Sequence, residues 1–148
     1  MICTKRRLRL CTTLLAATLA FIWGNSLLPA EISHAMSEWI KGMLKPFLSE
    51  GASVTREGNS LIRKIAHFAE FFALGFLIAW RRGMLRKSQA RGFAAGTAAA
   101  ALDESIQLFV PGRGPGLSDV VLDSCGVLTG MLFLHLGHTL LKKRNLQS

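Results

Sequence analysis

Residues 61–80 read LIRKIAHFAEFFALGFLIAW, a segment long and apolar enough for a transmembrane helix that nevertheless carries charge. A helix needs about 20 residues to cross a bilayer. Spacings of four and three residues place Arg63, His67 and Glu70 on one face of such a helix. A charged acid at mid-bilayer costs roughly 2.5–3.5 kcal/mol. We therefore expect this polar face to turn towards other polar groups, a water-filled pocket or a ligand, and not towards lipid.

Three more segments have the length and apolar composition of a membrane span, at about residues 8–29, 92–110 and 119–141. Half of the 148 residues are hydrophobic, and they are concentrated in these runs. A soluble core would draw its apolar residues from the whole chain instead. We predict an all-α membrane protein, a bundle of four transmembrane helices that forms a single domain over residues 1–148.

Composition predicts the place of two of these spans. Residues 92–110 are rich in alanine, and small residues let helices approach closely, so we expect this span at the centre of the bundle. Residues 8–29 follow a basic start, as the apolar part of a signal peptide does. However, the run is long and residues 26–30 lack a small-x-small cleavage pattern, so we interpret it as a retained anchor.

The basic residues predict the orientation of the chain in the membrane. Eighteen lysines and arginines against nine acids give a net charge of +9. They gather before the first span, between the second and third spans at residues 81–91, and after the fourth span at residues 142–144. Loops rich in lysine and arginine stay in the cytoplasm. Both termini and the 81–91 loop are therefore predicted to be cytoplasmic, and the charge gives no reason to expect a nucleic-acid partner.

Between the first two spans, residues 31–48 show the apolar periodicity of an amphipathic helix. Trp39 lies in the apolar stripe, and Pro46 lies near the end of the segment. A helix of this kind can lie flat in the membrane interface with an aromatic side chain as anchor. We expect it on the extracytoplasmic surface, either as a lipid-binding helix or as a lid on the bundle.

The remaining polar side chains of the spans are predicted to lie at one depth. The third span carries some near its outer end, the fourth span carries some at its start, and the loop between them holds an arginine. These residues are Asp103, Glu104, Gln107, Arg113, Asp119 and Asp123. Three segments thus bring their charges into the outer leaflet, beside the polar face of residues 61–80. We predict an outward-facing polar pocket.

The same residues form three motifs that resemble those of VanZ-like membrane proteins. Residues 63–75 resemble the pattern RK-x-x-H-F-x-E-Y-x-x-L-G, residues 103–113 resemble D-E-x-x-Q-x-F-x-P-G-R, and residues 118–126 resemble the start of the last helix of that family. Phe71 stands where the family often has tyrosine, so a hydroxyl there is not essential to this chain. The resemblance implies a multi-pass protein of the bacterial cytoplasmic membrane. The family's namesake is linked to resistance to teicoplanin-type glycopeptide antibiotics.

Cations beside a cluster of acids in the outer leaflet suggest binding of a phosphate, because phosphates need arginine or lysine donors. We expect the pocket to bind or act on anionic envelope lipids or lipid-linked peptidoglycan precursors, and so to affect susceptibility to glycopeptides. The residues predicted to contact such a ligand are Arg63, Lys64, Gln107, Arg113 and Asp123. Membrane lipids are the expected partners, and a homo-oligomer is compatible with so few spans.

Two alternatives stay open. An intramembrane enzyme of envelope-lipid metabolism would use histidine and carboxylates as general acids and bases. Its candidate residues are His67, Glu70, Asp103, Glu104 and Asp119. The histidine with its acids could also hold a divalent cation, although neither a metal nor a cofactor is predicted here. The other alternative is a buried ion-pair network that only stabilises the bundle, because charges inside membranes usually pair with one another.

Overall fold

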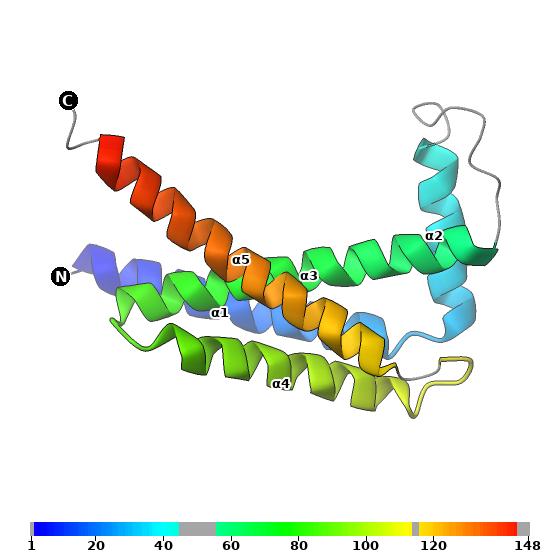
Figure 1. Cartoon of the computed structure of the whole chain (residues 1–148). Helices are drawn as coiled ribbons and strands as arrows, with labels where there is room; N and C mark the ends of the chain where they lie inside the picture. The colour runs from blue at the N-terminus through cyan, green and yellow to red at the C-terminus, as the bar shows by residue number, and fades with distance from the viewer. Residues whose placement is uncertain (1, 45–55, 114–115, 145–148) are drawn as a thin grey trace.

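The computed structural model describes residues 2–44, 56–113 and 116–144, and all regular structure in these ranges is helical. The helices are α1 (Ile2–Ser26), α2 (Ala30–Leu44), α3 (Arg56–Met84), α4 (Gln89–Gln107) and α5 (Leu117–Arg144) (Figure 1). This confirms the all-α prediction. α3 extends beyond the predicted span of residues 61–80 at both ends. α4 ends at Gln107, before the predicted end at residue 110, because a turn leads into Pro111.

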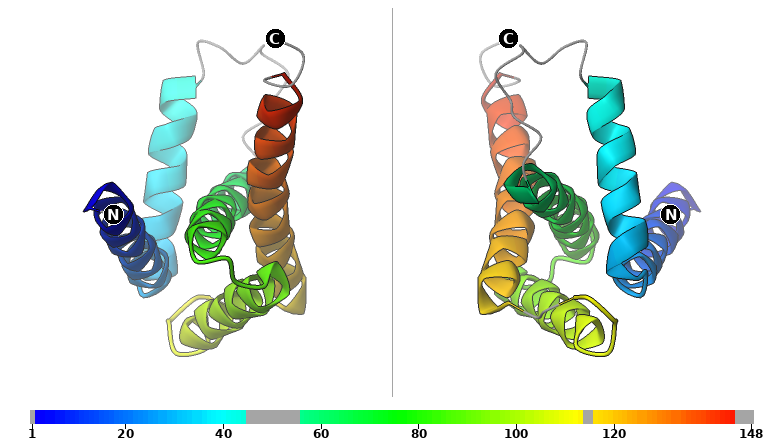
Figure 2. Two further views of the ribbon diagram at one scale, coloured as in Figure 1. Left: turned by 90° about the vertical axis from the view of Figure 1, so that its left-hand side faces the viewer. Right: turned by 90° about the vertical axis from the view of Figure 1, so that its right-hand side faces the viewer.

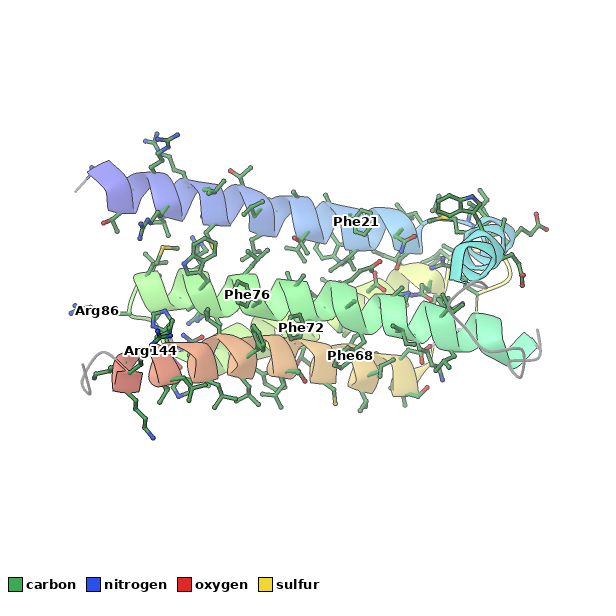
Figure 3. All side chains as sticks on the ribbon, turned by 90° about the horizontal axis from the view of Figure 1, so that it is seen from above. Phe21, Phe68, Phe72, Phe76, Arg86 and Arg144 are labelled. Carbon is green, nitrogen blue, oxygen red and sulfur yellow. The ribbon has the colours of Figure 1, made fainter. Side chains whose placement is uncertain are left out.

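Four helices run back and forth along one direction, and α2 lies across one end of them (Figure 1). Both termini and the connection between α3 and α4 lie at the other end (Figure 1). Arg86 and Arg144 lie at this end in Figure 3. The basic segments that the sequence assigned to the cytoplasm are therefore together at one end of the molecule, opposite α2.

α3 is the central helix of the bundle. It contacts each of the other four helices, whereas α4 contacts α1, α3 and α5. Seen end-on, α3 lies between α1, α4 and α5 (Figure 2). The prediction that residues 92–110 are central was wrong. The small residues of α4 do permit close packing, but on one face only: Gly92, Gly96, Ala99 and Ala100 are buried, and the alanines of the opposite face are exposed.

The closest helix crossing joins α3 to α5 and depends on glycines. A Cβ atom built at Gly75 would lie 2.1 Å from the Val127 carbonyl oxygen, and one at Gly130 would lie 2.1 Å from the Phe72 carbonyl oxygen. Only a residue without a side chain fits at such distances. Beside the crossing, Phe133 packs edge-on against Phe72 with ring centres 5.7 Å apart. Phe68, Phe72 and Phe76 follow the length of α3 alongside α5 (Figure 3).

The core lies where α1, α3, α4 and α5 meet. Its fully buried members include Ile22, Phe71, Leu74, Ala100 and Val127, each at most 1% exposed. Phe71 therefore has a packing role, which explains why phenylalanine can replace tyrosine at this position. A phenol hydroxyl buried in this core would need a hydrogen-bond partner.

The outside of the bundle is strongly apolar. α1 exposes Leu10, Leu14 and Phe21, and the second half of α5 exposes several large side chains, among them Phe133, which is 63% exposed. Soluble monomers rarely present such continuous apolar surface. Two segments, Thr4–Ser26 and Leu117–Arg144, are long and apolar enough to cross a membrane. α3 has the necessary length, with 29 residues, but carries the charges described above.

α2 is amphipathic, as predicted, and ends at Leu44; the predicted continuation to residue 48 lies outside the described residues. Ile32, Met36 and Trp39 form an exposed apolar stripe along it, and Trp39 is 69% exposed. α2 contacts α3, so it is attached to the bundle at the end opposite the termini (Figure 1).

Candidate functional site

Three buried side chains from three helices meet at the centre of the site. The Nδ1 atom of His67, on α3, lies 3.7 Å from Oδ2 of Asp103 on α4 and 3.7 Å from Oδ2 of Asp123 on α5. Both aspartates are fully buried, and the His67 side chain is 9% exposed. These distances exceed those of good hydrogen bonds. The three groups therefore face one another without closing a tight network.

Gln107 and a backbone amide satisfy part of the buried negative charge. The Gln107 side-chain amide lies one turn after Asp103 on α4 and donates to Asp103 Oδ2 at 3.1 Å and to Glu104 Oε1 at 3.3 Å. The backbone amide of Gly116 donates to Glu104 Oε2 at 3.0 Å. Glu104 thus connects the end of α4 to the start of α5. Gln107, which was predicted to contact a ligand, here contacts two carboxylates of its own helix.

The end of α1 supplies residues that the sequence analysis did not assign to the site. Asn25 donates to Glu70 Oε1 at 3.0 Å, and Ser26, which is buried, lies 3.5 Å from the Gln107 amide. A signal was present: Asn25 and Ser26 are a polar pair in an otherwise apolar span, one turn before Pro29. It was missed because short polar residues are common at helix ends for reasons of capping alone.

Arg113 is buried, although it lies in the glycine-rich α4–α5 connection. Its two terminal nitrogens donate to the Asn25 and Ser26 carbonyl oxygens at 3.3 Å and 3.4 Å. These carbonyls belong to the last turn of α1, where the regular helical donors run out; the Asn25 carbonyl also accepts from the Leu28 amide at 3.2 Å. Burial, reinforced by the positive charge of Arg63, lowers the pKa of the Arg113 guanidinium. Arg113 therefore holds α1 against the α4–α5 connection and bonds no carboxylate in the described part of the chain.

A small cavity of about 10 Å³ lies beside this cluster. A space of that size holds about one water molecule. The cavity is lined by Arg63, Lys64, His67, Glu104, Asp119, Leu122 and Asp123. Arg63 lies 3.9 Å from Asp119 at its edge, and both side chains are partly exposed. This pair is more exposed than His67 and Asp123.

Several buried polar atoms of the site have no hydrogen-bond partner among the residues that the structure describes. They include Nδ1 of His67, Oδ1 of Asp103 and both carboxylate oxygens of Asp123. Burying such atoms unpaired is costly, so they are rare in proteins and require an explanation. Two of these unpaired atoms, Nδ1 of His67 and Oδ2 of Asp123, face each other at 3.7 Å across α3 and α5.

A family model described as VanZ/LLP1 matches residues 11–138, which is most of the chain. The chain belongs to the VanZ/LLP1 family. No match to a curated protein or to a solved structure was found. Together with the two apolar helices, family membership supports a membrane protein.

In this VanZ-family chain, the three motifs read from the sequence fold into one site. α3, α4 and α5 contribute His67, Asp103 and Asp123 to its centre, with Glu104 and Gln107 beside them. Arg63, Lys64 and Asp119 surround the cavity on its outer side. Glu70 lies next to α1 and is bonded by Asn25. A second cleft, of about 200 Å³ between α1, α3 and α4, is mostly apolar and lies nearer the basic end.

Proposed function

We propose that this protein spans the bacterial cytoplasmic membrane four times, with both termini in the cytoplasm, and that its site lies in the outer leaflet. The observations in support are the gathering of the basic segments at one end and the apolar outer surface of α1 and α5 (Figure 1). Positive charge concentrates on the cytoplasmic side of membrane proteins. α2 is then extracytoplasmic, and its exposed Ile32, Met36 and Trp39 suit an interfacial helix.

At this site the protein binds the phosphate group of an anionic envelope lipid or of a lipid-linked peptidoglycan precursor. One observation carries the proposal: Arg63 and Lys64 line the mouth of a polar cavity at the predicted depth of lipid head groups. The Lys64 side chain is exposed and Arg63 is 29% exposed, so both can reach a ligand from outside. A cavity of about 10 Å³ cannot enclose a phosphate. The phosphate therefore binds at the mouth, in front of His67 and Asp123.

Arg113 has a different role in this proposal from the one expected from the sequence. Its guanidinium is already committed to two carbonyl oxygens of α1. It positions the helices around the site rather than touching the ligand. Arg63 and Lys64 bind the phosphate directly, and Gln107 and Asp123 lie deeper in the site.

An intramembrane enzyme is the second candidate, and the buried His67 favours it. A histidine between two aspartates at 3.7 Å could act as a general acid or base on a phosphate bound at the mouth. A purely structural network is the weakest of the three readings. Such a network would hydrogen-bond its buried atoms, whereas neither oxygen of Asp123 has a hydrogen-bond partner among the described residues.

The test is lipid retention by the purified protein. Wild type, Lys64→Ala and Arg63→Ala are extracted in mild detergent, and bound lipids are identified by mass spectrometry. Lys143→Ala, which removes an exposed cation at the opposite end, is the matched control. We expect the first two variants to lose the phosphate-bearing lipid while their thermal stability stays near wild type, because exposed ion pairs contribute little. Retention equal to wild type in both variants would refute phosphate binding at this mouth.

A further inference from the structure

We propose that His67, Asp103 and Asp123 form a binding site for one divalent transition-metal ion, with Zn²⁺ as the best-matched ion. The site lies behind the predicted phosphate site and is defined by its own residues. The proposal does not depend on phosphate binding.

The geometry of the donors fits an ion. One ligand atom from each residue lies within 4.8 Å of the other two, and Nδ1 of His67 is 3.7 Å from each aspartate oxygen. Zinc bonds histidine nitrogen and carboxylate oxygen at about 2.0–2.2 Å, which separates tetrahedral ligands by about 3.3 Å. The observed separations are a few tenths of an ångström longer for two of the three pairs. Small side-chain movements therefore bring all three donors onto one ion.

The three residues are buried, and the facing atoms of His67 and Asp123 have no hydrogen-bond partner among the described residues, unlike those of an acidic cluster on a surface. Asp123 is fully buried, and neither of its carboxylate oxygens has a hydrogen-bond partner in the described ranges. His67 is nine-tenths buried, and its Nδ1, also without a hydrogen bond, faces both aspartates. A buried donor that nothing satisfies is destabilising unless a ligand completes it.

The balance of charge also favours a cation at this point. Asp103, Glu104 and Asp123 are at most 5% exposed. Among the described residues, no lysine or arginine nitrogen lies within 4.0 Å of their oxygens; Arg63 pairs with Asp119, and Arg113 bonds carbonyls. Buried charges in proteins are paired or bind metals. A divalent ion between His67, Asp103 and Asp123 would neutralise the two aspartates.

The donor types select the ion. Imidazole nitrogen suits zinc and other first-row transition metals, whereas magnesium prefers six oxygen ligands and keeps most of its water. Three protein donors leave at least one position open, as zinc sites with an exchangeable ligand do. The neighbouring cavity of about 10 Å³, lined by His67 and Asp123, has room for one water molecule there.

The test is a zinc titration of the full-length protein in detergent, purified without a polyhistidine tag, stripped with a chelator and kept free of added lipid. Metal content is measured by mass spectrometry of the element, and affinity by calorimetry. We expect about one zinc per chain. Loss of an outer-shell partner already costs 10–100-fold in metal affinity, so His67→Ala, Asp103→Asn and Asp123→Asn should each cost about 100-fold. His135→Ala, which removes an exposed histidine of α5, should bind like wild type.

A second measurement covers variants that fold poorly. Asp123→Asn keeps the shape of the side chain and removes an unpaired buried charge, so without zinc its melting temperature should equal or exceed that of wild type. Added zinc should raise the melting temperature of wild type and leave that of Asp123→Asn unchanged. The proposal is overturned if wild type binds no more zinc than His67→Ala. It is equally overturned if zinc stabilises Asp123→Asn as much as wild type, or if His135→Ala alone abolishes binding. Because no lipid is added and the readout is bound zinc, its outcome is separate from that of the lipid-retention experiment.

Discussion

Two glycine-to-alanine substitutions on α5 are expected to change stability in opposite directions. A Cβ atom at Gly130 would lie 2.1 Å from the Phe72 carbonyl oxygen and 2.8 Å from the Phe76 backbone nitrogen. A Cβ atom at Gly137, two turns later on the same helix, meets nothing within 4 Å. The same methyl group is therefore added once at the α3–α5 crossing and once at a position with no neighbouring atoms.

The magnitude follows from what blocks each methyl group. At Gly130 the methyl group is about 1.3 Å short of the 3.4 Å at which ordinary contact begins, and its neighbours are backbone atoms, which cannot rotate away. Overpacking a core costs about 1–3 kcal/mol, and a rigid neighbour puts this case at about 3 kcal/mol. At Gly137 alanine only improves helix propensity, by up to about 1 kcal/mol. The two variants should thus differ by about 4 kcal/mol.

The assay is reversible unfolding by titration with a denaturing detergent in mixed micelles, followed by tryptophan fluorescence and helical circular dichroism. Wild type provides the reference free energy of unfolding. If Gly130→Ala and Gly137→Ala were equally stable within about 0.5 kcal/mol, the usual scatter of surface substitutions, then α3 and α5 could not approach as closely as described here.

Two further predictions concern the outer connection and the orientation. Arg113→Ala should lower the free energy of unfolding by about 1–3 kcal/mol, because it removes the arginine donor from the buried Ser26 carbonyl and leaves the Asn25 carbonyl with the Leu28 amide alone; thermal unfolding that matches wild type would show that water replaces the guanidinium there. Single cysteines introduced into a cysteine-free background at Ser118 and Ser88 should react with a membrane-impermeant reagent from outside only at Ser118, and labelling at Ser88 alone would reverse the orientation.

The site was largely predictable from the sequence because insertion into a membrane penalises stray charge. That penalty predicts that Asp103, Glu104, Asp119 and Asp123 lie at one depth in the bundle. It fixes depth but not angular position around each helix. The pairing of Arg63 with Asp119 was one of several that depth alone allowed, and the fold is what selects it.

The place of α4 and the role of Arg113 were not predictable in this way. An alanine-rich span indicates close approach on some face, but the sequence does not show that only one face of α4 is used. Arg113 was predicted to contact a ligand, yet its side chain bonds the last turn of α1. Its partners there are backbone carbonyls, which every residue has. A sequence pattern can therefore predict that two opposite charges pair, but not that a charge bonds the end of a helix.

The glycine contacts of the α3–α5 crossing lie directly beside the polar site. Gly126 lies one turn after Asp123, and a Cβ atom there would come within 2.8 Å of the carbonyl oxygen of Phe68, the residue that follows His67. The backbone contact that only glycine permits is thus adjacent to the 3.7 Å approach of His67 to Asp123. A larger residue at the crossing would separate the helices where their polar groups meet. Gly126 and Gly130 therefore set the separation of the donors as well as the packing of α5 on α3.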